Sequence, residues 1–370
     1  MPRNQHPAVA RWHAHLRDLA TEIHEISGLG YETDRIVGSR FALLSVALLV
    51  VCFGMSCDQG PSKSGEKGME ISDVDKVTER LREHVEHLTV TIGERSVGMP
   101  ENLEKTASYI ESFYQDLQIP SHRDSYNYNN FTVASIVAEI DLGVNPTKRY
   151  LLGAHYDSVW GTVGADDNAS AIAVQLETAR ELKSLLGGKD LGIGVRFVSF
   201  PLEEPPAFGT RYMASKIYAK KAKKKNEQID GMLCLEMVGY TCHQKGCQDY
   251  PFPLLFMGYP DEGNFIGIVG NLKSTGLTKS LYRAFRKNRD LPVVKLTVPF
   301  GGWLLPSVRL SDHAPFWDQG YKAVMITDSA FYRNPHYHQP SDTMDKLNYK
   351  FMAQLVKSLV MFFTQVSGKQ

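Results

Sequence analysis

Two adjacent carboxylates, Glu203 and Glu204, follow the apolar run Val195–Phe200 in the segment VRFVSFPLEEPPAFGT. Removing a carboxylate from water costs several kcal/mol unless an opposite charge or hydrogen bonds compensate. Two such charges at the end of a buried strand therefore need a partner. The pair alone is equally compatible with a surface turn, so its meaning depends on which other residues gather near it.

Imidazoles and carboxylates also follow other apolar runs of the chain. They are His155 and Asp157 in GAHYDS, Asp166 and Asp167 in GADDNAS, Glu236 in LEMVGY, and His336 and His338 in NPHYHQPSDT. In an open α/β sheet, functional groups gather beyond the carboxyl ends of the strands. Each motif alone has an ordinary explanation, such as a helix cap for one of the two aspartates. Their joint occurrence in one domain favours a common site.

A cluster of carboxylates and histidines without a nearby Lys or Arg repels itself, and one or two divalent cations neutralise it. Mixed ligation by His, Asp and Glu suits zinc with water held at an open position. Neighbouring side chains diverge, so one glutamate of the Glu203–Glu204 pair can bind metal while the other acts as a general base. The residues therefore predict metal-dependent chemistry.

Alternating helices and strands carry these residues from about residue 71 onward. Helices are predicted over Asp73–Val90, Asn102–Leu117, Asn168–Leu186, Gly209–Lys224, Thr278–Asn288 and Lys350–Val366. Strands are predicted over Thr132–Ile140, Arg149–Tyr156, Val195–Phe200, Met232–Val238, Phe265–Val269, Val293–Val298 and Ala323–Thr327. Several strands are continuous apolar runs, which is typical of strands covered by helices on both faces. We therefore expect one three-layer α/β/α domain.

The chain resembles the zinc aminopeptidase family of bacterial leucyl aminopeptidase and glutamate carboxypeptidase in five motifs. In chain order, these are GAHYDS, GADDNAS, the Glu–Glu pair, LEMVGY and YHQPSDT. The resemblance covers about residues 75–370. It implies a central mixed, mostly parallel sheet of the zinc-exopeptidase type, and two zinc ions per chain, with a single ion as the alternative. The implied ligands are His155, Asp167 and Glu236 for one ion, and Asp167, Glu204 and His338 for the other.

The same resemblance assigns the remaining roles. Glu203 is the implied general base, and Asp157 is implied to orient His155 from outside the ligand set. A cis peptide bond is implied between Asp167 and Asn168.

Some residues near the motifs receive no ligand role. His338 stands in the family's frame, four residues before Asp342, so His336 is taken as a rim or structural residue. Asp312 and His313 in RLSDHAPF are taken as structural. Glu236 stands where the family often has Asp, and EEPPAFGT replaces a common glycine-rich continuation, so the local pocket differs from the family pattern.

The first 70 residues are expected to lie outside the catalytic domain. The apolar run Phe41–Phe53 follows Arg35 and Arg40 and is too short to span a bilayer, which is typical of a signal-peptide core. The following GMSC resembles a bacterial lipoprotein signal and implies lipidation of Cys57; a plain secretory signal or an uncleaved anchor is the alternative. We expect residues 1–57 to form a disordered extension plus leader, 58–70 a tether, and 71–370 the zinc peptidase domain.

The composition and the spacing of the cysteines limit further which class of protein this can be. The chain has 41 basic and 41 acidic residues and zero formal net charge, which argues against a nucleic-acid-binding protein. Cys242 and Cys247 are spaced to close a small surface loop in an oxidising compartment. Cys234 lies in an apolar run and is predicted to be a buried hydrophobe.

Together with the resemblance, these observations predict an exported zinc exopeptidase of the periplasm or cell envelope. Among exopeptidases, they favour an aminopeptidase that acts on peptides. We expect a monomer that contacts the membrane only through an N-terminal anchor. The first alternative is a glutaminyl cyclase with one zinc ion. A catalytically inactive binding module that keeps the fold is the second.

Overall fold

The computed structural model of the chain describes residues 73–367, except for 187–189 and 252–257. Contacts divide the chain into Met1–Gly68 and Met69–Gln370, and every element below belongs to the second unit. The predicted leader, the tether and Cys57 lie outside the described residues. Within the described part, no helix is long and apolar enough to cross a membrane.

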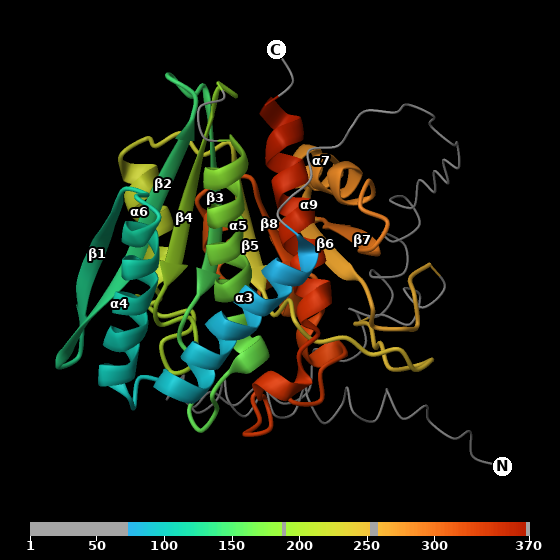
Figure 1. Cartoon of the computed structure of the whole chain (residues 1–370), viewed down its shortest axis with the longest axis horizontal. Helices are drawn as coiled ribbons and strands as arrows, with labels where there is room; N and C mark the ends of the chain where they lie inside the picture. The colour runs from blue at the N-terminus through green and yellow to red at the C-terminus, as the bar shows by residue number, and fades with distance from the viewer. Residues whose placement is uncertain (1–72, 187–189, 252–257, 368–370) are drawn as a thin grey trace, which may run out of the picture. The chain divides into compact units, whose positions relative to one another are not determined.

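An eight-stranded sheet forms the centre of the domain, with strand order β1-β2-β4-β3-β5-β8-β6-β7 (Figure 1). Its strands are β1 Ser121–Tyr128, β2 Phe131–Leu142, β3 Lys148–His155, β4 Ile193–Phe200, β5 Gly231–Glu236, β6 Ile266–Asn271, β7 Val293–Val298 and β8 Ala323–Thr327. The pairs β1–β2, β2–β4 and β6–β8 are antiparallel, and the other four pairs are parallel. The predicted mixed, mostly parallel sheet is confirmed.

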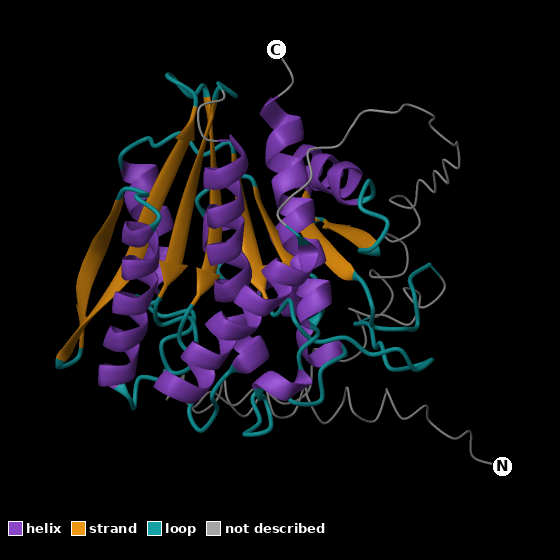
Figure 2. Ribbon diagram, viewed as in Figure 1, coloured by secondary structure: helices purple, strands orange, loops and turns teal. Residues whose placement is uncertain are grey.

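Helices cover both faces of this sheet (Figure 2). They are α3 Val74–Glu86, α4 Pro100–Asp116, α5 Ala171–Leu186, α6 Ala214–Lys224, α7 Thr275–Phe285, α8 His313–Asp318 and α9 Tyr349–Ser367. Helices α3, α4, α5, α7 and α9 contribute to one buried apolar cluster, whereas α6 and α8 contribute to a second. Leu152 belongs to the first cluster and its neighbour Leu151 to the second, because successive strand side chains point to opposite faces. The three-layer prediction is confirmed.

Strand β1 is the strand that the sequence did not predict, and the short helix α8 was not predicted either. Its residues SHRDSYNY are polar, and most of their side chains stay partly exposed. β1 lies at the sheet edge and pairs only with β2. An edge strand packs fewer side chains than a central one and is often polar, so the apolar pattern that locates the central strands misses it.

The six predicted helices begin one to five residues from the predicted positions, and local contacts explain the starts of α6 and α7. Helix α6 begins at Ala214 rather than Gly209, because hydrogen bonds from Ala207 N to Glu204 O and from Thr210 N to Ala207 O form turns before it. Helix α7 begins at Thr275, directly after a 3₁₀ turn in which Asn271 accepts from the backbone N–H of Ser274. Side-chain and turn contacts, rather than apolar spacing, set these two starts.

Three parallel strands place predicted site residues at the edge of the sheet that is formed by their carboxyl ends. His155 is the last residue of β3 and Glu236 is the last residue of β5. Glu203 and Glu204 follow the end of β4 at Phe200. The arrowheads of β3, β4 and β5 point to this edge in Figure 1.

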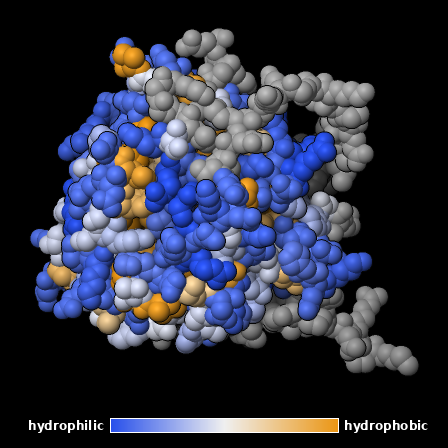
Figure 3. Space-filling model, in the orientation of Figure 1, coloured by the Kyte–Doolittle hydropathy of each residue, from blue (hydrophilic) through white to orange (hydrophobic). Residues whose placement is uncertain are grey.

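Polar side chains dominate the face of the molecule drawn in Figure 3, and apolar ones form small separate patches there. Large exposed apolar side chains among the described residues include Trp160, Phe300, Trp303 and Leu304. Phe300, Trp303 and Leu304 belong to one short segment that follows β7, whereas Trp160 belongs to the loop that follows β3. Cys242 and Cys247 form a disulfide, which their spacing allows, and Cys234 is buried, as predicted.

Candidate metal centre

His155 is completely buried at the end of β3. Its Nδ1 lies 3.2 Å from the backbone oxygen of Asp157, and a carbonyl oxygen can only accept. In the neutral ring, therefore, Nδ1 carries the proton and Nε2 presents a lone pair. Within the described part of the chain, His155 Nε2 makes no hydrogen bond, although Asp167 Oδ1, Glu236 Oε1 and Glu203 Oε2 lie 3.3, 3.5 and 3.9 Å away. A buried nitrogen that faces carboxylates in this way fits a metal ligand.

His338 approaches the same carboxylates from the segment after β8. Its Nε2 lies 3.3 Å from Asp167 Oδ2 and 3.3 Å from Glu204 Oε2. The ring stacks on Tyr337 with 3.8 Å between centroids. His338 has a φ of +55°, which a residue with a side chain rarely adopts and which is common at functional sites. His336 instead contacts Ser341 Oγ through Nδ1 at 2.9 Å and lies outside the cluster.

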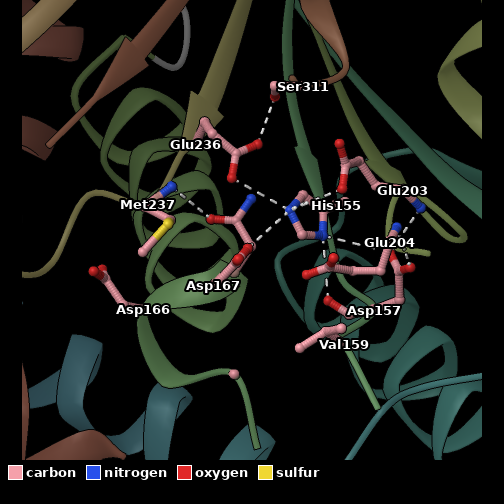
Figure 4. Close-up of polar contacts among 12 residues, drawn as sticks. His155, Asp157, Val159, Asp166, Asp167, Glu203, Glu204, Glu236, Met237 and Ser311 are labelled. Carbon is pink, nitrogen blue, oxygen red and sulfur yellow. Dashed lines mark hydrogen bonds and ion pairs between the residues drawn. The ribbon is translucent and has the colours of Figure 1, made fainter. Parts of the chain in front are cut away.

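Asp167 stands between the two histidines and turns one oxygen toward each. Groups of possible ligand atoms that lie within 4.8 Å of one another are His155–Asp167–Glu236, Asp167–Glu204–His338 and His155–Glu203–Glu204. The first two sets match the ligand sets implied by the sequence. Glu203 of the third set lies 3.9 Å from His155 Nε2, farther than Asp167 at 3.3 Å and Glu236 at 3.5 Å. Figure 4 shows Asp167, Glu203 and Glu236 around the His155 ring.

The turn that carries Asp167 depends on a glycine and an amide side chain. Gly164 has a φ of +52°, and a Cβ atom there would lie 2.1 Å from the backbone oxygen of Asp167. Asn168 donates through Nδ2 to Leu235 O and accepts through Oδ1 from Met237 N, so it fixes the turn to the backbone on both sides of Glu236. The peptide bond between Asp167 and Asn168 is cis, as the resemblance implied.

Two buried aspartates hold the backbone beneath the carboxylate pairs. Asp157 accepts hydrogen bonds from the backbone N–H groups of Glu203 at 3.1 Å and Glu204 at 3.0 Å. Its Oδ1 also lies 3.4 Å from His155 Nδ1. Asp342 accepts in the same way from the backbone N–H groups of Asp166 at 2.9 Å and Asp167 at 3.1 Å.

Asp166 belongs to this supporting layer rather than to the metal cluster. In Figure 4 its carboxylate points away from His155. Its oxygens accept from Gly239 N at 2.9 Å and from Asn334 Nδ2 at 2.7 Å. Asp166 therefore connects the turn of Asp167 to the segments that follow β5 and β8.

Sequence reasoning missed several residues that contact the predicted ligands. Ser311 donates from Oγ to Glu236 Oε2 at 2.5 Å. Asp312 interacts electrostatically with His155 and Glu236; it is completely buried, its two oxygens have no hydrogen-bond partner among the described residues, and burial raises its pKa to about 7. Both lie in RLSDHAPF, which resembled a family segment near the site, but neither residue has a spacing signal of its own. Asp342 served only as a reference point for His338.

Negative charge dominates the electrostatics of the pocket. Burial alone would lower the pKa of His338, but Glu204 and Asp167 outweigh it and raise the pKa to about 11. The pKa of His155 is also raised against its burial by neighbouring glutamates. Burial raises the pKa of Glu203, and burial with the nearby Asp167 raises that of Glu204 to about 7. The pocket therefore attracts positive charge, which agrees with a cation site.

Residues 135–363 match the family model of peptidase family M28. The chain belongs to peptidase family M28. The chain is 35% identical over 290 residues to the uncharacterized protein YfbL of Escherichia coli K12, covering 76% of this chain and 86% of that protein. It is 28% identical over 250 residues to a probable leucine aminopeptidase 1 of Trichophyton verrucosum, covering 65% of this chain and 59% of that protein. The sequence-based resemblance is confirmed.

Solved structures of two kinds of enzyme share the fold of this M28 chain. LapB from Legionella pneumophila has a TM-score of 0.59 at 21% identity, covering 83% of this chain and 79% of that chain. Glutaminyl cyclase from Porphyromonas gingivalis has a TM-score of 0.57 at 17% identity, covering 79% of this chain and 98% of that chain. These similarities establish the fold and leave the reaction to the chemistry of the site.

Proposed function

We propose that this chain is a zinc-dependent exopeptidase that removes N-terminal residues from peptides. The observation that carries the proposal is the position of Asp167, which offers one oxygen to the set around His155 and the other to the set around His338. A carboxylate shared by two ligand sets is suited to hold two metal ions side by side.

The chemistry of the donors fits zinc. Each set combines one imidazole nitrogen with carboxylate oxygens, and all the donor residues except His338 are buried. In addition to His155 Nε2, Glu204 Oε1 is buried without a hydrogen-bond partner in the described structure. When bound, zinc would act as a Lewis acid toward the scissile carbonyl and increase the acidity of water.

Glu203 is the residue that we assign to proton transfer. It belongs to neither of the two sets that share Asp167, yet its Oε2 lies 3.9 Å from His155 Nε2. Its backbone N–H is fixed by Asp157, so the carboxylate is held beside the ligand cluster. In this role, a Glu203 oxygen takes a proton from the attacking water and returns it to the leaving amine.

The cellular location belongs to the same proposal. We assign export to the apolar run Phe41–Phe53 and the lipoprotein-like GMSC that contains Cys57. The Cys242–Cys247 disulfide supports an oxidising compartment such as the periplasm. We propose that the protein acts there as a monomer, with a lipid on Cys57 as its membrane anchor.

A peptide panel tests the reaction. Purified zinc-loaded protein is incubated with leucyl and glutaminyl peptides and with the same peptides carrying a blocked N-terminus. We expect free leucine from the first peptide and no product from the blocked ones, together with two zinc ions per chain. Pyroglutamate from glutaminyl peptides, no leucine, and one zinc ion would instead identify the alternative, a glutaminyl cyclase.

A further inference from the structure

Arg95 is a completely buried arginine behind the candidate metal centre. It belongs to the segment GERS, which precedes α4 and which carries none of the motifs described above. Every hydrogen bond of its side chain goes to a backbone carbonyl: Tyr156 O, Val163 O, Gly164 O, Leu88 O and Gly93 O. Among the described residues, no carboxylate lies within ion-pair distance of its guanidinium.

Three of the five carbonyls that Arg95 contacts lie at the two ends of one loop. Tyr156, whose oxygen is 2.7 Å from Arg95 Nε, directly follows His155. Val163 and Gly164, whose oxygens are 2.6 and 3.0 Å from Arg95 Nη1 and Nη2, begin the turn that carries Asp167. One planar group therefore connects the two segments that present the predicted ligands of the first metal set.

The backbone of Arg95 reaches the middle of the same loop. Its N–H donates to Ser158 Oγ at 3.0 Å, and that hydroxyl donates to Thr162 O at 3.0 Å. The contacts to Leu88 and Gly93 fix the guanidinium to the chain between α3 and α4. The loop 156–164 is thus held from a part of the fold that contributes no ligand.

The positive charge of Arg95 is opposite to the charge of the carboxylate cluster. Burial lowers the pKa of Arg95 to about 10, while Asp157, Asp342, Asp167 and Glu204 act in the opposite direction. The guanidinium is therefore still a cation at neutral pH. It offsets part of the repulsion among the carboxylates whether or not a metal ion is bound.

We propose that Arg95 is a positioning residue of the metal centre, because its guanidinium holds the loop 156–164 at the spacing that places His155 and Asp167 together. The inference rests on the metal site of the proposed function, but not on the identity of its substrate. A role confined to general packing would stabilise the fold without a selective effect on this loop or on zinc binding.

Hydrogen exchange on the metal-free wild-type protein provides the first measurement. We expect the amide of Thr162, which donates to Val159 O within the loop, to be protected from exchange before zinc is added. Rapid exchange of this amide, with protection gained only on zinc addition, would overturn the proposal without reference to any variant.

Three variants provide the second measurement. R95M removes both the charge and the donors, whereas R95K keeps the charge but loses the planar set of five donors. R80M is the matched control, because Arg80 ties α3 to Glu177 and Glu181 of α5 and makes no contact with the loop. Each variant is examined by circular dichroism, hydrogen exchange, zinc titration against a chromophoric chelator, and separate measurement of kcat and KM.

We expect R95M to bind zinc at least about tenfold more weakly, the size typical for residues that support metal ligands, with faster exchange concentrated in residues 157–164. R95K should fall between R95M and wild type, and R80M should keep wild-type zinc affinity.

If R95M does not fold, R95K and the wild-type exchange data decide. Unchanged zinc affinity in folded R95M or R95K, or losses equal to those of R80M, would overturn the proposal. Zinc and exchange effects without any peptidase activity in wild type would instead contradict only the proposed function.

Discussion

Glu203 and Glu204 are neighbours in the chain, but their side chains have different partners. Glu204 Oε2 lies 3.3 Å from His338 Nε2 and its Oε1 is buried without a hydrogen bond. Glu203 stands beside His155 and outside the two sets that share Asp167. Asp157 fixes the backbone of both. The difference between the two side chains is therefore one of direction, which single substitutions can test.

The first prediction concerns this pair. Glu203→Gln keeps the shape of the side chain but cannot take a proton, so kcat should fall by about 100-fold or more with unchanged zinc content. Glu204→Gln should lose zinc, because an amide is a weaker ligand than a carboxylate. Zinc per chain by elemental analysis and kcat on a leucyl peptide measure both effects, with the exposed Glu79→Gln as a control. Equal zinc loss in the two variants would contradict the assigned roles.

At the scale of secondary structure, the contact between α3 and α5 depends on one buried carboxylate. Glu177 of α5 accepts from Arg80 Nε at 2.6 Å and Arg180 Nε at 2.9 Å, and its Oε1 lies 3.0 Å from His84 Nε2. Its side chain is completely buried. Helix α5 begins directly after the turn of Asp167, so this contact supports the helix that follows the candidate site.

The second prediction is that Glu177→Gln lowers the free energy of unfolding by about 3 kcal/mol at pH 7, as expected when a buried ionic contact loses one partner. Burial acts to raise the pKa of Glu177, but His84 and the arginines outweigh it and the net pKa is lowered. The contribution of Glu177 is therefore complete above its unfolded-state pKa of about 4.3 and is lost as pH falls through its folded-state value.

Urea unfolding at several pH values from 7 to well below about 4.3 measures this effect, because the contribution of Glu177 begins to fall only below its unfolded-state pKa. The difference between wild type and Glu177→Gln should shrink toward the acidic end. The control is Glu111→Gln, which removes a partly exposed ion pair with Arg123 and should cost less than about 1 kcal/mol. A pH-independent difference, or an equal cost for the control, would argue against the buried ionic contact.

For the molecule as a whole, zinc that binds only the folded state must stabilise it. The third prediction is that wild type holds two zinc ions per chain and that chelation lowers its unfolding temperature. A free zinc concentration about 1000-fold above the Kd adds about 4 kcal/mol per site. His155→Ala and His338→Ala should each retain one ion, and Asp167→Ala should retain neither ion fully.

Native mass spectrometry and calorimetry with and without chelator provide the measurements. His336→Ala is the matched control, because this neighbouring histidine contacts Ser341 rather than the cluster. It should keep two ions and the wild-type unfolding temperature. Loss of zinc from His336→Ala, with none from His338→Ala, would reverse the assignment of the two histidines.

The fourth prediction concerns processing of the whole chain. If the segment around Cys57 acts as a lipoprotein signal, the mature protein begins at Cys57 and carries a lipid. Mass spectrometry of membrane and soluble fractions from a bacterial host should find no peptide from residues 1–40 in the mature form. Cys57→Ser should move the protein out of the membrane fraction. Residues 1–40 still attached in that fraction would disprove cleavage.

The sequence by itself determined the layer architecture and the residues that meet beyond the carboxyl ends of the central strands. Central strands such as β3 and β5 are buried on both faces, so their apolar runs identify them directly. His155 and Glu236 end those strands, and parallel strands place their last residues together. Strand β1 escaped prediction because its edge position imposes no apolar pattern on SHRDSYNY.

Tertiary structure alone decided the residues that hold the site in place. In the sequence, Arg95 lies 61 to 69 residues before the loop carbonyls that it contacts. Its other two side-chain bonds go to the nearby carbonyls of Leu88 and Gly93. Every residue has a backbone carbonyl, so none of these partners is marked by its residue type. Asp342 holds amides more than 170 positions away. Such contacts use the backbone of the distant segment, whose position depends on the packing of the entire domain. They leave no residue pattern in the sequence, whereas metal ligands do because only a few side chains can bind zinc.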